Sequence, residues 1–497
     1  MHRSVVIALI PALALIGGCT AFNPNEAAPP TASAQYTPPN AGTYQKALAQ
    51  NATGQPSSTT AQGKTEPATL DLNKTYRLPD LVDLAESTNP ETRVAWELTR
   101  QAAVAVGLKE AAYYPILEAL AHSGDGVLDI TLRNPPPGFK EPKIDAQGEG
   151  AGLLLKWLLF DFGAREEDVA AAKHELVATT MGFNEVHQKI ILEVTRTYYT
   201  LCAERGKLAV AKSNLESAQA VADAANERIN HGTATSPDLL LAKERAVQAN
   251  YDLIQASAED DIALANLCEA VGILPTTKLK IADMDGKSLP KHLEETIESD
   301  TAQALADRPD LIAAMAEIKA KNAELHKAQD EMLPKISMLA TADRSYATAT
   351  AYPIPVNNAH LTIDAYAVLL QAEWTIFDGF ANVNKIREAE SQKRQAESEL
   401  AQTRTKIAGQ VFRAYMKLKT SLRKLEVSKA LVETSQKSYE ASMDSYKQGL
   451  RTILDTLAAQ HDLRVAQETD IATRAEVYTN WQDLAFAMGH IRSPGAN

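Results

Sequence analysis

The sequence predicts a mainly α-helical chain with a smaller membrane β part, built from two tandem repeats. Three observations lead to this fold class. Only 6% of the 497 residues are aromatic, while alanine, leucine, glutamate and lysine dominate long stretches. Two segments of nearly 70 residues contain no proline. A group of short motifs appears twice in the same order. The first two observations are typical of long helices, and the third indicates an internal duplication.

The duplication is carried by a seven-residue motif. Trp-Leu-Leu-Phe-Asp-Phe-Gly at 157–163 recurs as Trp-Thr-Ile-Phe-Asp-Gly-Phe at 374–380. The same spacing places Gly232, Asp238 and Gly272 onto Gly449, Asp455 and Gly489. We therefore expect six segments: a signal peptide at 1–18, a lipidated cysteine and flexible Pro-rich tether at 19–75, repeat 1 at 76–275, an inter-repeat linker at 276–300, repeat 2 at 301–491 and a tail at 492–497.

Each repeat is predicted to contain a helix, a strand–loop–strand unit, a long helix, a turn and a further helix. The long helices are expected at Gly163–Asn230 and Phe380–Gln448, each about 100 Å long at 1.5 Å per residue. Apolar residues alternate four and three apart from Val411 to Leu425, as in a coiled-coil seam. The shorter helices are expected at Leu78–Tyr113, Pro237–Val271, Ala304–Met332 and Ile453–Met488.

Four segments have the alternation of membrane strands. In Tyr366–Ile376 one face is apolar and aromatic, while the other carries Gln371, Glu373 and Thr375. The other strands are expected at Ile116–Ser123, Ala151–Phe160 and Ile336–Tyr346. Four strands cannot close a barrel, and lipid does not tolerate an open sheet edge. Several copies must therefore share one barrel; two copies would give eight strands and three would give twelve.

The N-terminus resembles a bacterial lipoprotein signal. An apolar run from Val5 to Ile16 ends in Gly17-Gly18-Cys19, which is similar to a lipobox, so Cys19 is the expected lipidation site. The alternative is an ordinary cleaved signal with an incidental cysteine. Thr20 favours sorting to the outer membrane. The remaining cysteines, Cys202 and Cys268, are interpreted as buried thiols, because the sequence cannot bring them within disulfide reach.

The repeated motifs give the chain a resemblance to the TolC family of outer-membrane efflux proteins, covering roughly Tyr76 to Ile491. The marks are the paired Trp-x-x-Phe-Asp motifs, the Tyr-Pro step at Tyr114 and the turn at 449–455. The resemblance implies a homotrimer with a 12-stranded β-barrel continuing into an α-helical barrel. It also implies an outer-membrane channel of a tripartite efflux or type I secretion system, lipid-anchored and extending into the periplasm, with a periplasmic adaptor and an inner-membrane transporter as partners.

The same resemblance suggests the gate residues. Asp455 matches the position of the family's pore constriction. The other interpretation is a carboxylate at the start of a helix, stabilised by the helix dipole, and both roles can hold together. Asp238, Tyr446 and Arg451 match a hydrogen-bonded latch between the two turns, and they could equally be plain surface residues. Two positions depart from the family: Pro237 replaces a hydrogen-bonding threonine, and Ala458 replaces a second aspartate.

Other functional classes fit less well. A net charge of −13 without any basic cluster argues against a nucleic-acid partner. The ten histidines are scattered and match no metalloprotease pattern, so we expect no enzyme activity, cofactor or metal site. The alternative that we keep is a periplasmic adaptor lipoprotein with long helical hairpins, although adaptors lack a tandem duplication with membrane strands. The sequence does not identify the cargo.

Overall fold

The computed structural model describes residues 29, 31–33, 74–129, 131, 137–138, 143–232, 234–282, 297–353 and 356–489. The predicted signal peptide, Cys19, nearly all of the tether and the tail lie outside the described residues. The chain forms two compact units. Of the described residues, unit 1 contains those within 102–176 and 317–397, and unit 2 contains those within 25–101, 177–316 and 398–489. The long helices α6 (Ala164–Asn230) and α10 (Ala381–Lys447) contribute residues to both units.

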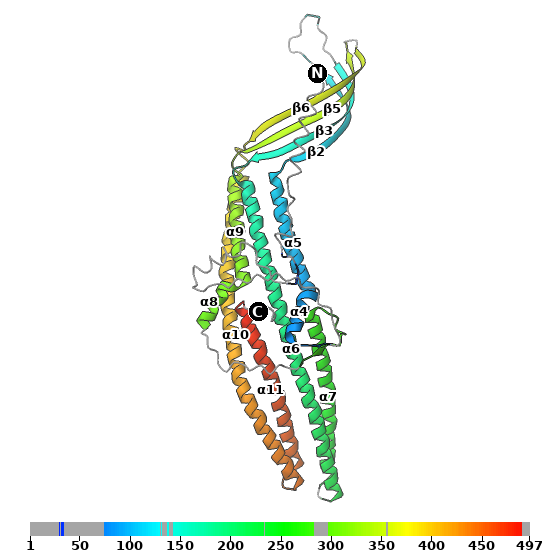
Figure 1. Cartoon of the computed structure of the whole chain (residues 1–497), viewed down its shortest axis with the longest axis vertical. Coiled ribbons are helices and arrows are strands. Elements are labelled where there is room, and N and C mark those ends of the chain that lie inside the picture. Colours follow the sequence, from blue (N-terminus) through cyan, green and yellow to red (C-terminus); the bar gives the residue numbers. More distant parts are fainter. Residues whose placement is uncertain are drawn as a thin grey trace. The chain divides into compact units, whose positions relative to one another are not determined.

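Unit 1 contains a four-stranded antiparallel sheet (Figure 1). Its strands are β2 (Ile116–Asp129), β3 (Lys143–Phe160), β5 (Lys335–Tyr352) and β6 (Val356–Glu373), in the order β2-β3-β5-β6. The two central strands come from different repeats and pair from Lys143–Tyr352 to Phe160–Ile336. One sheet therefore joins the repeats, with a repeat 1 strand at one edge and a repeat 2 strand at the other.

The strands are longer than the sequence pattern indicated. The prediction covered only the part of each strand in which apolar residues alternate. The strands continue past that part through polar residues such as Asp125, Gln147 and Thr348. The expected strand Tyr366–Ile376 was wrong at its end, because β6 stops at Glu373. Trp374 instead lies in the connection to α10, where its indole donates a hydrogen bond to the backbone.

The repeated tryptophan has the same role in both copies. Trp157 Nε1 donates to the carbonyl oxygen of Tyr113 at 2.9 Å, and Trp374 Nε1 donates to that of Met332 at 3.0 Å. Both acceptors lie just before the strand that opens the hairpin. The tryptophan therefore ties the end of each hairpin to its beginning, which explains why the motif needs an indole N–H.

The rest of the motif forms the turn from strand to helix. Asp161 accepts a hydrogen bond from the backbone N–H of Arg165, and Asp378 accepts one from that of Asn382. Each aspartate therefore satisfies an N–H group that has no partner within the helix. The two residues after each aspartate have positive φ angles, 58° and 109° at 162–163 and 72° and 69° at 379–380. Phenylalanine and glycine exchange places between the copies, but the left-handed turn is kept.

Asp168 joins three helices in unit 1. Its carboxylate accepts hydrogen bonds from Lys327 of α9 (Pro309–Asp330) at 2.7 Å and from Lys109 of α5 (Pro90–Glu110) at 3.2 Å. Burial acts to raise the pKa of Asp168, but the two ammonium groups outweigh it and hold the pKa below its ordinary value. The first turns of α6 are thus fixed to both shorter helices.

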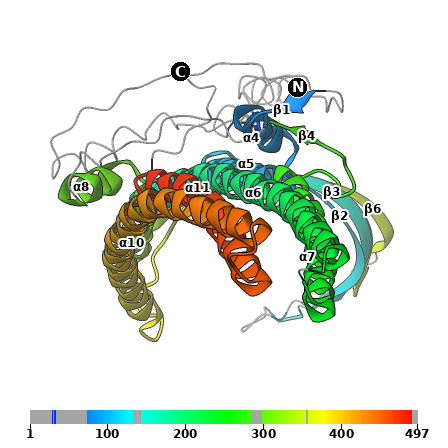
Figure 2. The same ribbon diagram turned by 90° about the horizontal axis from the view of Figure 1, so that it is seen from below.

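Unit 2 contains α4 (Leu78–Thr88), α7 (Ser236–Val271), α8 (Ile297–Asp307) and α11 (Ile453–Ala487), with parts of the helices named above. Figure 2 shows α7 beside α6 and α11 beside α10. The end points of α6, α7, α10 and α11 agree with the predicted helices to within one residue. No helix in the described part of the chain is both long and apolar enough to cross a membrane.

Two predicted helices are each broken in two. The expected helix Leu78–Tyr113 divides into α4, α5 and a short 3₁₀ turn (Ala111–Tyr113). The expected helix Ala304–Met332 divides into α8 and α9, but α8 begins earlier, at Ile297, and α9 ends earlier, at Asp330. Both breaks come directly before a proline, Pro90 or Pro309. A residue before proline is sterically disfavoured in the helical conformation, so Asn89 is extended, with φ −67° and ψ 125°.

The breaks are matched by equivalent contacts in the two repeats. Asn89 Nδ2 donates to the carbonyl oxygen of Ala270 at 2.9 Å, and Arg308 Nη1 donates to that of Ala487 at 3.3 Å. A glycine with positive φ, Gly272 or Gly489, lies two residues after each acceptor. A Cβ atom on Gly272 would lie 2.6 Å from Asn89 Cα, so only glycine allows this approach.

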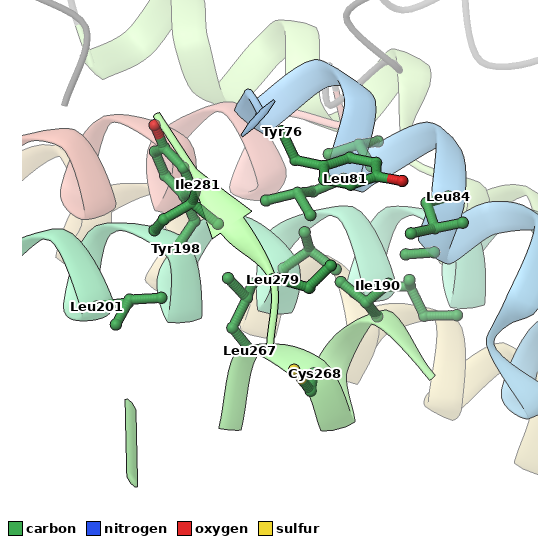
Figure 3. Close-up of a cluster of buried hydrophobic side chains, with 14 of the residues drawn as sticks. Tyr76, Leu81, Leu84, Ile190, Tyr198, Leu201, Leu267, Cys268, Leu279 and Ile281 are labelled. Carbon is green, nitrogen blue, oxygen red and sulfur yellow. The ribbon is translucent and has the colours of Figure 1, made fainter. Parts of the chain in front are cut away.

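Three buried clusters lie in unit 2. The first joins α4, α6 and α7 with the short parallel strands β1 (Thr75–Tyr76) and β4 (Lys280–Ile281) (Figure 3). Cys268 belongs to this cluster and Cys202 packs against it. The two are thiols rather than a disulfide. The second cluster contains Val411, Leu418 and Leu425, which confirms the predicted seam of α10. Two-residue strands such as β1 and β4 carry no detectable sequence pattern.

Candidate functional site: the turns of the helical hairpins

The predicted gate residues lie in or directly beside two tight turns, which join α6 to α7 and α10 to α11. Both turns lie at the same end of unit 2 (Figure 1). Gly232 and Gly449 occupy matching positions with φ of 71° and 80°. Each turn then leads to a threonine that precedes the next helix, Thr235 or Thr452. The turns are therefore built on the same plan.

Asp238 and Asp455 are both held by a capping box. Asp238 Oδ2 accepts hydrogen bonds from Thr235 N at 3.0 Å and Thr235 Oγ1 at 2.7 Å. Asp455 Oδ2 accepts the matching bonds from Thr452 at 3.2 and 2.8 Å. These bonds favour the ionised carboxylates and lower the pKa of each aspartate below its ordinary value. Both carboxylates remain charged at neutral pH.

The structure of Asp455 is compatible with both of the roles considered from the sequence. Its capping box makes it a helix-terminus carboxylate, yet its side chain is exposed. Ala458 lies one turn further along the same exposed side of α11. Each chain therefore presents one negative charge at this point, where a second aspartate would have given two. A role in a pore constriction stays a prediction.

Tyr446 lies in the last turn of α10, next to the α10–α11 turn, and its side chain is buried. It is 3% exposed and packs with Val221, Ala225, Ile453 and Leu457. Burial raises the pKa of its phenol above the ordinary value. The neighbouring Arg228 guanidinium acts against this rise in pKa.

Arg228 is a residue of this site that the sequence analysis missed. Its Nη1 donates to the carbonyl oxygen of Tyr446 at 2.6 Å, and its guanidinium lies over the Tyr446 ring with Cζ 4.7 Å from the centroid. Arg228 thus ties the last turn of α6 to the α10–α11 turn. The sequence feature that could have indicated Arg228 is its position as the basic residue in the last turn of α6. The duplication gave no support, because the matching residue in the other repeat is Ser445.

The predicted hydrogen bond between Arg451 and Asp238 is not formed within one chain. Among the described residues, no hydrogen bond or ion pair joins the two. Arg451 is exposed and contributes, after the Thr452 bonds, to the lowered pKa of Asp455. The latch therefore stays a prediction, and the contact formed within one chain is between Arg228 and Tyr446. The described residues also contain no cluster of three or more potential metal-binding side chains.

Comparison with known proteins gives the family. The model of the family described as outer membrane efflux protein matches residues 81–273 and 301–490. These two segments make up more than half of the chain. The chain belongs to the outer membrane efflux protein family. This assignment does not favour the alternative of a periplasmic adaptor, and the two matched segments lie one in each predicted repeat.

Individual members of the outer membrane efflux family are distant in sequence. Protein CyaE of Bordetella pertussis is 26% identical over 339 residues, covering 64% of both chains. Outer membrane efflux protein BepC of Brucella suis is 27% identical over 206 residues, covering 41% of this chain and 44% of BepC. The matches thus span less than two thirds of either relative. The outer-membrane channel OprN is similar in structure, with a TM-score of 0.70 at 19% identity, covering 88% of this chain and 99% of OprN.

Proposed function

We propose that this protein is an outer-membrane channel of a tripartite efflux or type I secretion system. It is a passive conduit from the periplasm to the exterior, and a periplasmic adaptor and an inner-membrane transporter open it at the helical turns. The single observation that carries this proposal is the four-stranded sheet with open edges at β2 and β6 on the fold of an outer-membrane channel.

Open edges require more than one copy of the chain. Unpaired backbone N–H and C=O groups cost several kcal/mol each in a bilayer, so β6 of one copy must pair with β2 of the next. The family resemblance sets the number at three, which gives the predicted 12-stranded barrel. The sheet carries the large apolar side chains that such a barrel presents to lipid: Tyr366, Val368 and Leu370 are each more than 70% exposed.

The proposed anchor and gate complete this function. Cys19 would carry the lipid, and three copies of Asp455 would surround the entrance. A ring of carboxylates at a constriction favours cations over anions. Arg451, exposed at the α10–α11 turn of each copy, is available to Asp238 of a neighbouring copy, so the latch would form between subunits.

The test is assembly followed by conductance. The mature protein, purified in detergent, should run as a trimer in analytical ultracentrifugation and should form discrete ion-conducting channels in a planar lipid bilayer. A monodisperse monomer, or a trimer that never conducts, would contradict the proposal. The adaptor alternative predicts a monomer or dimer that binds a channel and conducts nothing.

A further inference from the structure

A group of polar side chains on one face of the membrane sheet has no part in the turns described above. His122 on β2 and Ser345 on β5 both lie opposite Gly150 of β3, and Asp343 lies opposite Gly152. Directly opposed residues on neighbouring strands share a face, so all of these residues lie on one side of the sheet. They form two adjacent rows across it.

The side chain of His122 contacts those of Ser345 and Asp343 across β3, the strand that lies between β2 and β5. Ser345 Oγ donates to Asp343 Oδ1 at 2.6 Å, and His122 Nε2 lies 3.2 Å from Ser345 Oγ. His122 Nδ1 is 3.8 Å from Asp343 Oδ2. Strands two apart in a sheet are separated by about 10 Å, so these contacts need side chains that lie flat over the middle strand.

Two glycines make this arrangement possible. A Cβ atom on Gly150 would lie 2.6 Å from Ser345 Oγ and 2.7 Å from His122 Nε2, and one on Gly152 would lie 2.6 Å from Asp343 Oδ2. Real Cβ atoms do not approach other atoms so closely. Because Gly150 and Gly152 have no side chains, those of His122, Ser345 and Asp343 can lie over β3. Any side chain at position 150 or 152 would displace these three residues.

This face is the inner face of the proposed barrel. The opposite face carries Tyr366, Val368 and Leu370 of β6, which are 76%, 74% and 72% exposed and suit contact with lipid, and further from the helices it carries the charged residues Glu149, Arg344 and Asp364. On β3, the positions that share a face with His122, such as Gly150 and Gly152, are less exposed than the alternating positions Glu149 and Ala151, as expected for the inner side of a curved sheet. His360 of β6 pairs with Thr348, which places it on that outer face. The chain therefore carries one histidine of this sheet on each face.

His122 and Asp343 are the outermost charged positions of the inner face. Towards the helices, the next charged groups are Glu118 and Lys156, which neutralise each other in an ion pair of 3.0 Å. No charged residue faces the group from β6, where the partners of Asp343 and Ser345 are Ala365 and Ile363. Beyond His122, the described positions of this face are occupied by small or apolar residues: Gly124, Gly126, Leu128, Ile144, Ala146, Gly148, Ala347, Ala349, Ala351, Ala359 and Leu361.

We propose that His122, Ser345 and Asp343 form a selectivity site in the channel lumen whose net charge depends on pH. Histidine is the side chain that ordinarily changes charge between about pH 5 and 8. With a neutral imidazole, the site carries the single negative charge of Asp343 and favours cations. With an imidazolium, the two charges cancel and the preference for cations falls. The inference rests on the proposed channel function and concerns the passage of charged solutes.

The experiment compares ion selectivity at pH 8 and pH 5.5 in planar bilayers. Wild-type channels are expected to lose about twofold in the K⁺/Cl⁻ permeability ratio on acidification, measured near 0.1 M KCl, where charges act over about 10 Å. His122→Gln should keep the pH 8 ratio at both pH values. The matched control is His360→Gln, which removes a histidine from the outer face of the same sheet and should behave as wild type.

A second variant keeps the test decisive. Asp343→Asn should lower the ratio already at pH 8 and lower it further at pH 5.5, because the imidazolium is then uncompensated. The proposal is overturned if His122→Gln retains the wild-type pH dependence, or if His360→Gln abolishes it. Wild-type trimers that form no channel would overturn the proposed function and, with it, this site.

Discussion

The exposed carboxylate of Asp455 accepts two hydrogen bonds from Thr452 and still faces solvent. Asp455→Ala removes both the capping box and the charge. We expect lower cation selectivity and weaker block by multivalent cations in bilayer recordings, since three carboxylates would be lost from the constriction. Asp238→Ala is the comparison variant: it removes the equivalent capping box from the other turn and also the predicted partner of Arg451, so it should change closed-state conductance and leave selectivity nearly unchanged. If both variants change selectivity equally, Asp455 has no special place in the pore.

Arg228 is the residue that holds the α10–α11 turn within one chain. Arg228→Gln loses the guanidinium over the Tyr446 ring and the charge-assisted bond to its carbonyl oxygen. The turn is then less firmly held, so closed-state conductance should rise while selectivity changes little. Arg451→Ala is expected to act in the same direction through the predicted bond to Asp238. A rise in Arg451→Ala alone would show that the contact within the chain does not hold the gate.

Cys19 is the third residue with a separable role. Cys19→Ser should leave an unlipidated protein with slower maturation and altered migration on a gel, because serine cannot form the thioether. Radiolabelled palmitate should mark the wild type and not the variant. Equal labelling of both proteins would contradict the lipobox interpretation. The barrel strands do not depend on the lipid, so channel formation should persist.

At the scale of elements, Asp168 links α6 to α5 and α9. Because its folded pKa is lowered, the stabilisation is present above the unfolded value of about 3.9 and is lost as pH falls through the folded value. Asp168→Asn should therefore lower the melting temperature at pH 7, for a loss of roughly 1–2 kcal/mol, and the difference from the wild type should shrink progressively as pH falls below about 3.9. Glu433→Gln, which removes an exposed pair with Lys437, should leave the melting temperature unchanged.

Elements with a long periodic pattern were predictable from the sequence. The seam from Val411 to Leu425 and the absence of proline fixed the long helices, and the repeated motif located both strand-to-helix turns. The helix breaks were missed although Pro90 and Pro309 mark them, because proline is also tolerated in the first turn of a helix. Nothing local indicates where a broken helix resumes.

Contacts between distant segments were the least predictable. The pairing of β3 with β5 depends on register between repeats, which alternation alone does not set. Arg228 was missed because its partner is a backbone carbonyl 218 residues away. The side chains of His122, Ser345 and Asp343 meet only when β2, β3 and β5 are paired in register and positions 150 and 152 are glycine. The gate residues Asp455, Tyr446 and Arg451 came from the family resemblance, and the residues alone would not have selected them.

At the scale of the whole molecule, the order β2-β3-β5-β6 makes two kinds of junction equivalent. Inside the chain, the second strand of repeat 1 pairs with the first strand of repeat 2. Between copies, the second strand of repeat 2 would pair with the first strand of repeat 1. Both are head-to-tail contacts of the kind that close into rings. The covalent connection between the repeats is therefore not needed to define either junction.

This equivalence suggests how the protein originated and how it can be divided. An ancestor with one repeat per polypeptide could have closed the same barrel from six identical subunits, and gene fusion would then have let the two halves diverge, as Arg228 and Ser445 have done. Two fragments separated within residues 283–296, co-expressed in one cell and each with its own export signal, should reassemble into a conducting ring of three plus three. Failure of separately stable fragments to associate would show that fusion has since become indispensable.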